Sequence, residues 1–169
     1  RNHIWNSIFT GLVLTQSVSF LLAVGLPLFL FVDLNQCLFL SATGILIGMV
    51  FTALAFLSSI LSRDKAKGIG TAIMVWLFFA IIFDGLVLFL MFQLGDYPIE
   101  KPMVLLSAAN PIDMARIMNL IQLESSAMLG YTGAIFKKYF SSGIGTIISF
   151  SILITWSIIP YYLSLRIFR

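Results

Sequence analysis

Cysteine, histidine and charged side chains are scarce in this sequence. Of its 169 residues, one is cysteine, one is histidine and 10% are charged, whereas 60% are hydrophobic. A single cysteine, Cys37, excludes an internal disulfide and a zinc site built from several cysteines. Soluble proteins carry about 25% charged residues. The small charged fraction therefore predicts an integral membrane protein.

The sequence also lacks the patterns that catalysis or nucleotide binding would need. It contains no GxxxxGK[ST] segment, so we do not expect it to bind ATP through a P-loop. His3 and Cys37 fall on opposite sides of the membrane in the topology that the basic residues predict, which prevents a shared metal site or a nucleophile–base pair. We expect no catalytic residue, no cofactor-binding residue and no enzymatic activity in this chain.

Four apolar segments are long enough to cross a bilayer. Each has at least 22 residues, or about 33 Å of helix at about 1.5 Å per residue. The sequence predicts an all-α integral membrane fold with one domain over 1–169 and four transmembrane helices: 4–32, 38–61, 69–92 and 144–165. The short link at 33–37 makes the first two an antiparallel hairpin.

Small and polar residues mark candidate helix contacts in the first two spans. Gly44, Gly48 and Thr52 recur every four residues, a pattern that lets another helix approach closely, although small residues scattered by chance would look the same. Gln16 and the nearby Thr15 have no partner in lipid, so they should face other helices or a cavity. Gln16 is thus a candidate lining residue of a translocation path.

The basic residues predict the orientation. Arg1, the turn at 63–67, Arg166 and Arg169 all fall on one side if the four spans alternate, and the positive-inside rule places that side in the cytoplasm. Residues 93–143 then form an outer loop, in the periplasm of a Gram-negative cell. The net charge of +3 reflects these topology signals, so we expect no nucleic-acid partner.

The outer loop contains a helix start. Asn110 suits the N-cap, Pro111 suits the first helical position, and Asp113 places an acid near the positive end of the helix dipole. Beyond them the helix carries one apolar and one polar stripe, and it is too short and polar to span a bilayer. We expect it to lie at the membrane surface or to cover the bundle, followed by a second short helix over 126–140.

Asp84 and Arg116 are the charged residues most open to a functional interpretation. Asp84 is an acid inside an apolar run, where a carboxylate needs a partner or water. It could line the translocation path or act as a hinge for the outer helices, with Arg116 as its partner, or simply bond a serine or threonine of a neighbouring span. Arg116 could instead pair with Asp113 one turn away, or contact a periplasmic partner or an anionic cargo.

Met114 and Met118 are weak candidates for a metal site. Their thioethers lie one turn apart and suit Cu(I). The same stripe contains Ile117 and Ile121, however, and methionine commonly fills gaps in apolar faces. Packing against the bundle explains the two methionines better.

The order of the segments resembles the permease subunits of ABC-2-type exporters. The resemblance rests on four spans, a basic turn before the third, Asp84 within the third, and the run NPIDMARIMNL followed by AMLGYTGAIFKK before the last. Within that family, the outer loop and the segment SRDKAKGIGTAIMVWLFFAIIFDGLVL are similar to the NosY branch, the membrane subunits of the NosDFY system for nitrous oxide reductase maturation.

This resemblance implies a set of partners. The chain would correspond to spans three to six of a six-helix inner-membrane subunit and would be the C-terminal part of a longer protein, with its C-terminus in the cytoplasm. A second permease copy would form a homodimer, a separate cytoplasmic ABC ATPase would bind ATP, and a NosD-like periplasmic protein would dock on the outer helices. Candidate docking residues are Asn110, Pro111, Asp113 and Arg116.

The resemblance also implies a cargo, and other cargoes stay open. The NosY branch would export a sulfur species for the copper–sulfur centres of the reductase, or help a copper chaperone deliver metal. Other ABC-2 permeases handle lipids, polysaccharides, drugs or gliding-machinery components. A membrane anchor that recruits a periplasmic partner without transport is the alternative from a different class.

Overall fold

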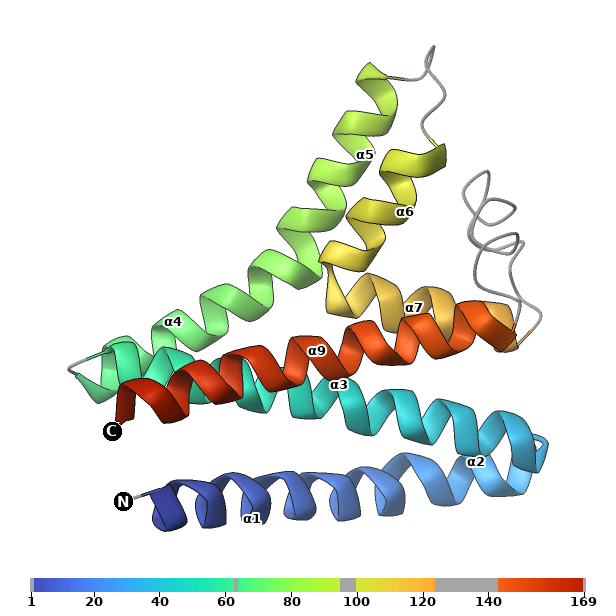
Figure 1. The fold of residues 1–169 in the computed structure, drawn as a ribbon. Helices are drawn as coiled ribbons and strands as arrows, with labels where there is room; N and C mark the ends of the chain where they lie inside the picture. Colours follow the sequence, from blue (N-terminus) through green and yellow to red (C-terminus); the bar gives the residue numbers. More distant parts are fainter. Residues whose placement is uncertain (1, 63, 95–99, 124–142, 169) are drawn as a thin grey trace. The chain divides into compact units, whose positions relative to one another are not determined.

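The computed structural model describes residues 2–62, 64–94, 100–123 and 143–168. These residues form helices joined by short connections, and no strand occurs among them (Figure 1). Four helices are long and apolar enough to cross a membrane: His3–Phe31, Leu34–Leu61, Lys65–Gln93 and Gly143–Phe168. The predicted all-α fold class with four membrane-length helices is confirmed.

The connections between these helices are shorter than the sequence predicted. The first span consists of α1 (Asn2–Phe20), the π-helical η1 (Leu21–Gly25) and α2 (Leu26–Phe31), and α3 (Leu34–Leu61) follows after two residues. Cys37 therefore lies inside α3 and not in the turn. The apolar runs underestimate the helices because polar residues can continue a helix at its ends, with their side chains turned toward water.

The chain forms two units, of which the first comprises residues 1–75 and 153–169. Within it α1 and α3 pack side by side as an antiparallel hairpin (Figure 1). α4 (Lys65–Leu77) begins four residues before the predicted third span, and α9 (Gly143–Phe168) contributes its second half.

Aromatic residues form the core of the first unit. Phe9 of α1 and Phe56 of α3 are buried, with ring centroids 5.3 Å apart. Trp5 packs on Phe56, and its indole Nε1 donates a hydrogen bond to Ser164 Oγ at 3.2 Å. Tyr161 packs on Phe9 at 4.2 Å between centroids. These contacts join α1, α3 and the end of α9, because aromatic pairs gain energy beyond the area that they bury.

The small residues of α3 are where α1 approaches closely. Side chains of α1 cover two glycines: the Phe20 ring lies on Gly44, and the Gln16 side chain lies on Gly48. Thr52 Oγ1 donates a hydrogen bond to Gln16 Oε1 at 2.8 Å. The predicted helix contact at the small-residue pattern is confirmed, since a larger residue at either glycine would overlap α1.

Thr15 was expected to face another helix or a cavity, and it lines a groove of about 530 Å³ together with Gln16 and Thr52. Its hydroxyl is exposed and donates to the Gly11 carbonyl at 2.8 Å, one turn back in the same helix. A threonine can satisfy itself in this way because its side chain reaches the i−4 carbonyl. Gln16 is longer and reaches α3 instead.

Gly48→Ala is expected to destabilise the hairpin, whereas Gly70→Ala should not. A methyl group at Gly48 would overlap the Gln16 amide and displace it from Thr52, at about 1–3 kcal/mol for an overpacked site. Gly70 is also helical, but a Cβ there meets nothing within 4 Å, so alanine should stabilise by about 0.5–1 kcal/mol. Thermal unfolding of both variants in detergent measures the difference, and equal effects would contradict the close contact.

The second unit comprises Trp76–Ile152. Its third-span segment contains the π-helical η2 (Phe78–Ile82) and α5 (Phe83–Gln93), and the region between the third and fourth spans contains α6 (Glu100–Ala109) and α7 (Pro111–Gln122). α7 begins at the predicted residue. α6 was not predicted, and the second predicted helix at 126–140 lies outside the described residues.

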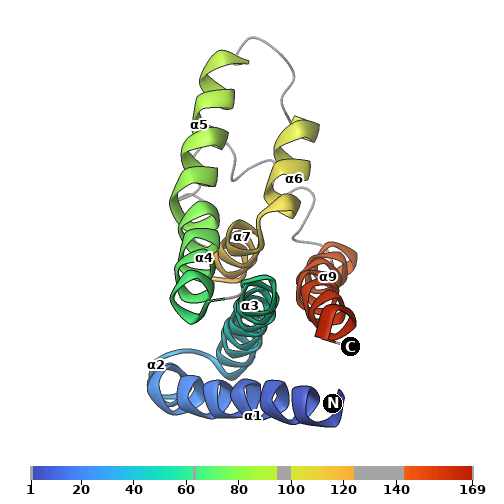
Figure 2. The same ribbon diagram turned by 90° about the vertical axis from the view of Figure 1, so that its left-hand side faces the viewer.

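α5 and α6 face one another across a small apolar cavity of about 290 Å³. Leu90 and Met91 of α5 and the following Leu94 line one side, and Pro102 and Met103 of α6 are on the other. α7 follows α6 after the single residue Asn110 and contacts η2. Figure 2 shows α7 beside the third span in this region.

Candidate functional site

Asn110 holds the start of α7 against the third span. Its Oδ1 accepts a hydrogen bond from the Ile112 backbone N–H at 3.0 Å, which caps the helix. Its Nδ2 donates to the Phe79 carbonyl oxygen in η2 at 2.9 Å. The side chain is fully buried, so both bonds are shielded from water. The predicted N-cap is confirmed. The hydrogen bond to Phe79, which joins α7 to η2, was not predicted from the sequence.

Arg116 forms two ion pairs one turn further along α7. Its Nη1 donates to Asp84 Oδ2 at 2.8 Å, and its Nη2 donates to Asp113 Oδ1 at 2.6 Å. The side chains of Arg116, Asp84 and Asp113 are 49%, 31% and 7% exposed, respectively. Both partners proposed for Arg116 from the sequence are therefore present together. We call Asp84, Asn110, Asp113 and Arg116 the α7 clamp.

Local geometry explains why these side chains meet. Asp113 and Arg116 are three residues apart in α7 and therefore lie on the same helix face. Asp84 is the second residue of α5, directly after η2, which contacts α7. The contact brings the acid of the third span within reach of the guanidinium, whose forked donors can bind two carboxylates at once.

The clamp changes the protonation of Asp113. Burial raises the pKa of the Asp113 carboxyl to about 6, and the neighbouring Asp84 carboxyl adds to the rise. The Arg116 charge and a hydrogen bond from Asn110 act in the opposite direction. Asp113 can therefore bind or release a proton near neutral pH. π-helical segments such as η2 are frequent at functional sites.

Asp113 departs from the expected stripe pattern. It was assigned to the polar arc of α7 opposite the apolar stripe, yet it is 5% exposed. The reason is that Asp84 and Arg116 give this face polar partners, so an acid can be buried there. The apolar stripe is also buried, at Met114, Ile117 and Met118, as packing requires.

The other candidate residues are Gln16, for a translocation path, and Met114 and Met118, for a metal site. Gln16 belongs to the first unit, where with Leu12 and Thr52 it lines a groove of about 530 Å³. Its role in a path stays a prediction. Within the residues that the structure describes, no three histidine, cysteine, aspartate or glutamate side chains are grouped to hold a metal. Copper binding by Met114 and Met118 also stays a prediction.

Neither η2 nor α6 was predicted from the sequence. The sequence of η2, FFAII, is that of an ordinary apolar helix, so no residue type predicted its π-helical geometry. α6 did carry a signal, since Pro102 in its first turn suits a helix start. The apolar residues that follow it could have been recognised as a helix.

Substitutions at Asn110 should separate its role as the N-cap of α7 from its hydrogen bond to the Phe79 carbonyl oxygen. Serine keeps an N-cap oxygen but cannot reach Phe79, and we expect a loss of about 1 kcal/mol for one hydrogen bond. Aspartate also keeps the cap, but its carboxylate would face the Phe79 carbonyl in a buried site, so we expect a loss of about 3 kcal/mol. Thermal unfolding measures both, with the exposed Asn35→Asp as the matched control. Equal losses of stability for Asn110→Ser and Asn110→Asp would contradict a hydrogen bond between Asn110 and the Phe79 carbonyl oxygen.

These features define a class. Four membrane-length helices, with a short amphipathic helix fastened to the third by the α7 clamp, are the fold of a multi-pass α-helical membrane protein. No protein-family model matches the chain. The chain is 34% identical over 90 residues to the probable ABC transporter permease protein NosY of Pseudomonas aeruginosa, a match that covers 52% of this chain and 32% of that protein. The resemblance to NosY-type ABC transporter permeases is thereby confirmed.

Proposed function

We propose that this protein is a membrane-spanning permease subunit of an ABC exporter of the NosY type. The observation that carries the proposal is the 34% identity to a probable ABC transporter permease over 90 residues. Four membrane-length helices support it. ATP would be hydrolysed by a separate cytoplasmic ATPase, and a second copy of the permease would complete the transporter.

The α7 clamp has a mechanical role in this proposal. ABC permeases work by moving membrane helices when their ATPase subunits bind and hydrolyse ATP. Because Asn110 and Arg116 fasten α7 to η2 and to Asp84, α7 would follow any movement of the third span. The position of α7 would then change with the conformational state of the transporter. A periplasmic NosD-like protein would dock on α7.

The proposed cargo follows the NosY resemblance. The permease would export a sulfur species for the copper–sulfur centres of nitrous oxide reductase, or it would help a copper chaperone to deliver metal to them. A permease for another cargo would keep the ATPase but would not need a NosD-like partner. A non-transporting anchor would need neither an ATPase nor a path for cargo. The partners therefore distinguish the three functions.

Co-purification tests the proposal. The tagged protein is expressed with the ATPase and periplasmic proteins encoded by neighbouring genes, extracted in detergent, and scored for both. We expect the wild type to retain both partners, and Arg116→Gln to lose the periplasmic one only. Lys67→Gln is the matched control, because it also removes one positive charge from an exposed helical position.

The other outcomes discriminate among the alternatives. Retention of an ATPase without a periplasmic protein would support an exporter with a different cargo and contradict the NosY assignment. Retention of a periplasmic protein without an ATPase would support the anchor. Retention of neither would contradict the transporter.

A further inference from the structure

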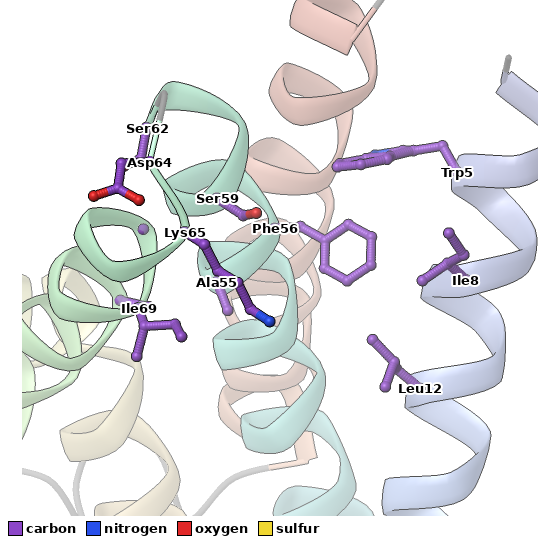
Figure 3. A pocket seen from close by; sticks show the side chains of 12 residues that line it. Trp5, Ile8, Leu12, Ala55, Phe56, Ser59, Ser62, Asp64, Lys65 and Ile69 are labelled. Atoms are coloured by element: carbon purple, nitrogen blue, oxygen red, sulfur yellow. The ribbon is translucent and has the colours of Figure 1, made fainter.

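A groove of about 600 Å³ lies within the first unit, between α1 on one side and α3 and α4 on the other (Figure 3). Trp5, Ile8 and Leu12 of α1 form one wall. The opposite side is lined largely by small residues of α3 and α4: Ala55, Ser59, Gly68 and Ala72. The groove exists because these side chains are too short to fill the space between helices that a larger residue would close.

The groove is lined mainly by apolar residues and has one cation, Lys65, and one acid, Asp64. Ile8, Leu12 and Ile69 are each about half exposed, so the groove is open along the side of the helices. The Lys65 side chain extends from the start of α4, and Figure 3 shows its ammonium group directed toward the space between α3 and α1. Among the described residues, Lys65 forms no ion pair.

The other polar groups of the lining leave Lys65 available to an anion. Asp64 is the one acid that lines the groove, and Figure 3 shows its carboxylate directed away from α1 and from the Lys65 ammonium group. Its Oδ1 accepts a hydrogen bond from the Ala66 backbone N–H at 3.4 Å. Ser59 and Ser62 add hydroxyl groups that can donate to an anion. Lys65 and the two hydroxyls belong to the same end of the helix hairpin, at the turn between α3 and α4.

We propose that this groove binds an anionic phospholipid. One acyl chain would lie along Ile8, Leu12 and Phe56, and the phosphate would contact Lys65. Charge complementarity favours this occupant, because the cation of the lining is directed into the apolar groove while its one acid, Asp64, is directed away from α1 (Figure 3), which matches a molecule with an apolar chain and an anionic head. The predicted orientation places this end in the cytoplasmic leaflet, where anionic lipids concentrate. Trp5 would lie at the interface, which indole side chains prefer.

This inference does not depend on transport, and Trp5 provides its test. The full chain with Trp76→Phe and Trp156→Phe keeps Trp5 as its one tryptophan. It is reconstituted in phosphatidylcholine vesicles that contain a small fraction of either brominated phosphatidylglycerol or brominated phosphatidylcholine. Bromine quenches indole fluorescence on contact, so quenching reports which lipid occupies the groove. We expect the brominated phosphatidylglycerol to quench Trp5 at a lower fraction than brominated phosphatidylcholine.

Two matched pairs of variants test the two halves of the site. Lys65→Gln should reduce the preference for phosphatidylglycerol about fivefold, the value of one basic residue at an anionic surface. Lys67→Gln removes the same charge two residues away, outside the groove lining, and should keep the preference. Ala55→Leu should fill the groove and abolish selective quenching. Ala42→Leu, at an exposed position of the same helix, should leave it unchanged.

Each contrary result would overturn the proposal. Equal quenching by the two lipids would show that the groove does not select an anion. Equal effects of Lys65→Gln and Lys67→Gln would assign any preference to general surface charge. A Trp5 shielded from both brominated lipids would show that a protein segment, from a second copy or a partner, occupies the groove. Far-ultraviolet circular dichroism and thermal unfolding establish that each variant is folded before its quenching is compared.

Discussion

Arg116→Glu is expected to release α7 from the third span. The substitution replaces the cation between Asp84 and Asp113 by a third carboxylate, so both ion pairs become repulsions. The pair with Asp84 is partly exposed and contributes at most about 1 kcal/mol, whereas the buried Asp113 loses its cation, so the expected loss is about 2 kcal/mol. Limited proteolysis should cut the region around α7 faster, and thermal unfolding in detergent should begin at a lower temperature.

Two further variants show whether the loss belongs to the clamp. Asp84→Arg combined with Arg116→Glu exchanges the charges across the contact and should recover part of the stability. Arg166→Glu makes the same charge reversal at an exposed position near the end of α9 and should have little effect. If Arg116→Glu and Arg166→Glu were equally mild, the ion pairs would not be what holds α7.

Stability should fall as the pH rises from about 4 to about 6. The pKa of Asp113 is raised from its ordinary 3.8 to about 6 by burial, so the folded protein binds the Asp113 proton more tightly than the unfolded chain does. The contribution is complete below about pH 4, is lost as the pH rises through 6, and is constant above that. The rise corresponds to a change on the order of 3 kcal/mol in the free energy of unfolding.

Thermal unfolding across this pH range measures the Asp113 contribution. Asp113→Asn cannot ionise and should remove most of the pH dependence between 4 and 6, whereas the exposed Asp33→Asn should keep it. A wild-type stability that rises with pH over this interval would show that the Asp113 carboxylate is stabilised by Arg116 more than it is penalised by burial.

The sequence predicted the parts of the clamp that depend on local chemistry. Asn110 and Pro111 predicted where α7 begins because a cap and a proline act within one turn. The pairing of Arg116 with Asp113 followed from helix periodicity. The cost of an unpartnered carboxylate in a span predicted that Asp84 has a partner, but it left open whether this was Arg116 or a serine or threonine of a neighbouring span. The roles of these residues in transport or docking stay predictions.

Other parts of the structure depend on contacts that the sequence does not record. The Asn110 bond to Phe79 joins residues 31 positions apart, and nothing in either residue specifies the other. The burial of Asp113 depends on Asp84 reaching it from another helix. Thr15 and Gln16 are adjacent and polar, yet only Gln16 is long enough to reach α3.

The π-helical η2 also limits how the length of this chain can change. A π turn holds one more residue than an α turn, so deleting one residue from Phe78–Ile82 would restore an ordinary α-helix and keep the span hydrophobic. Because the π turn absorbs its extra residue locally, this deletion would leave the later side chains of the span facing as they do now, and Asp84 would stay directed toward Arg116. The loss of one residue from the α-helical part between the start of the span and Leu77 would instead rotate every later side chain by about 100°, at about 3.6 residues per turn. A relative of this protein that has one residue fewer within 78–82 should therefore keep both its acid and its arginine.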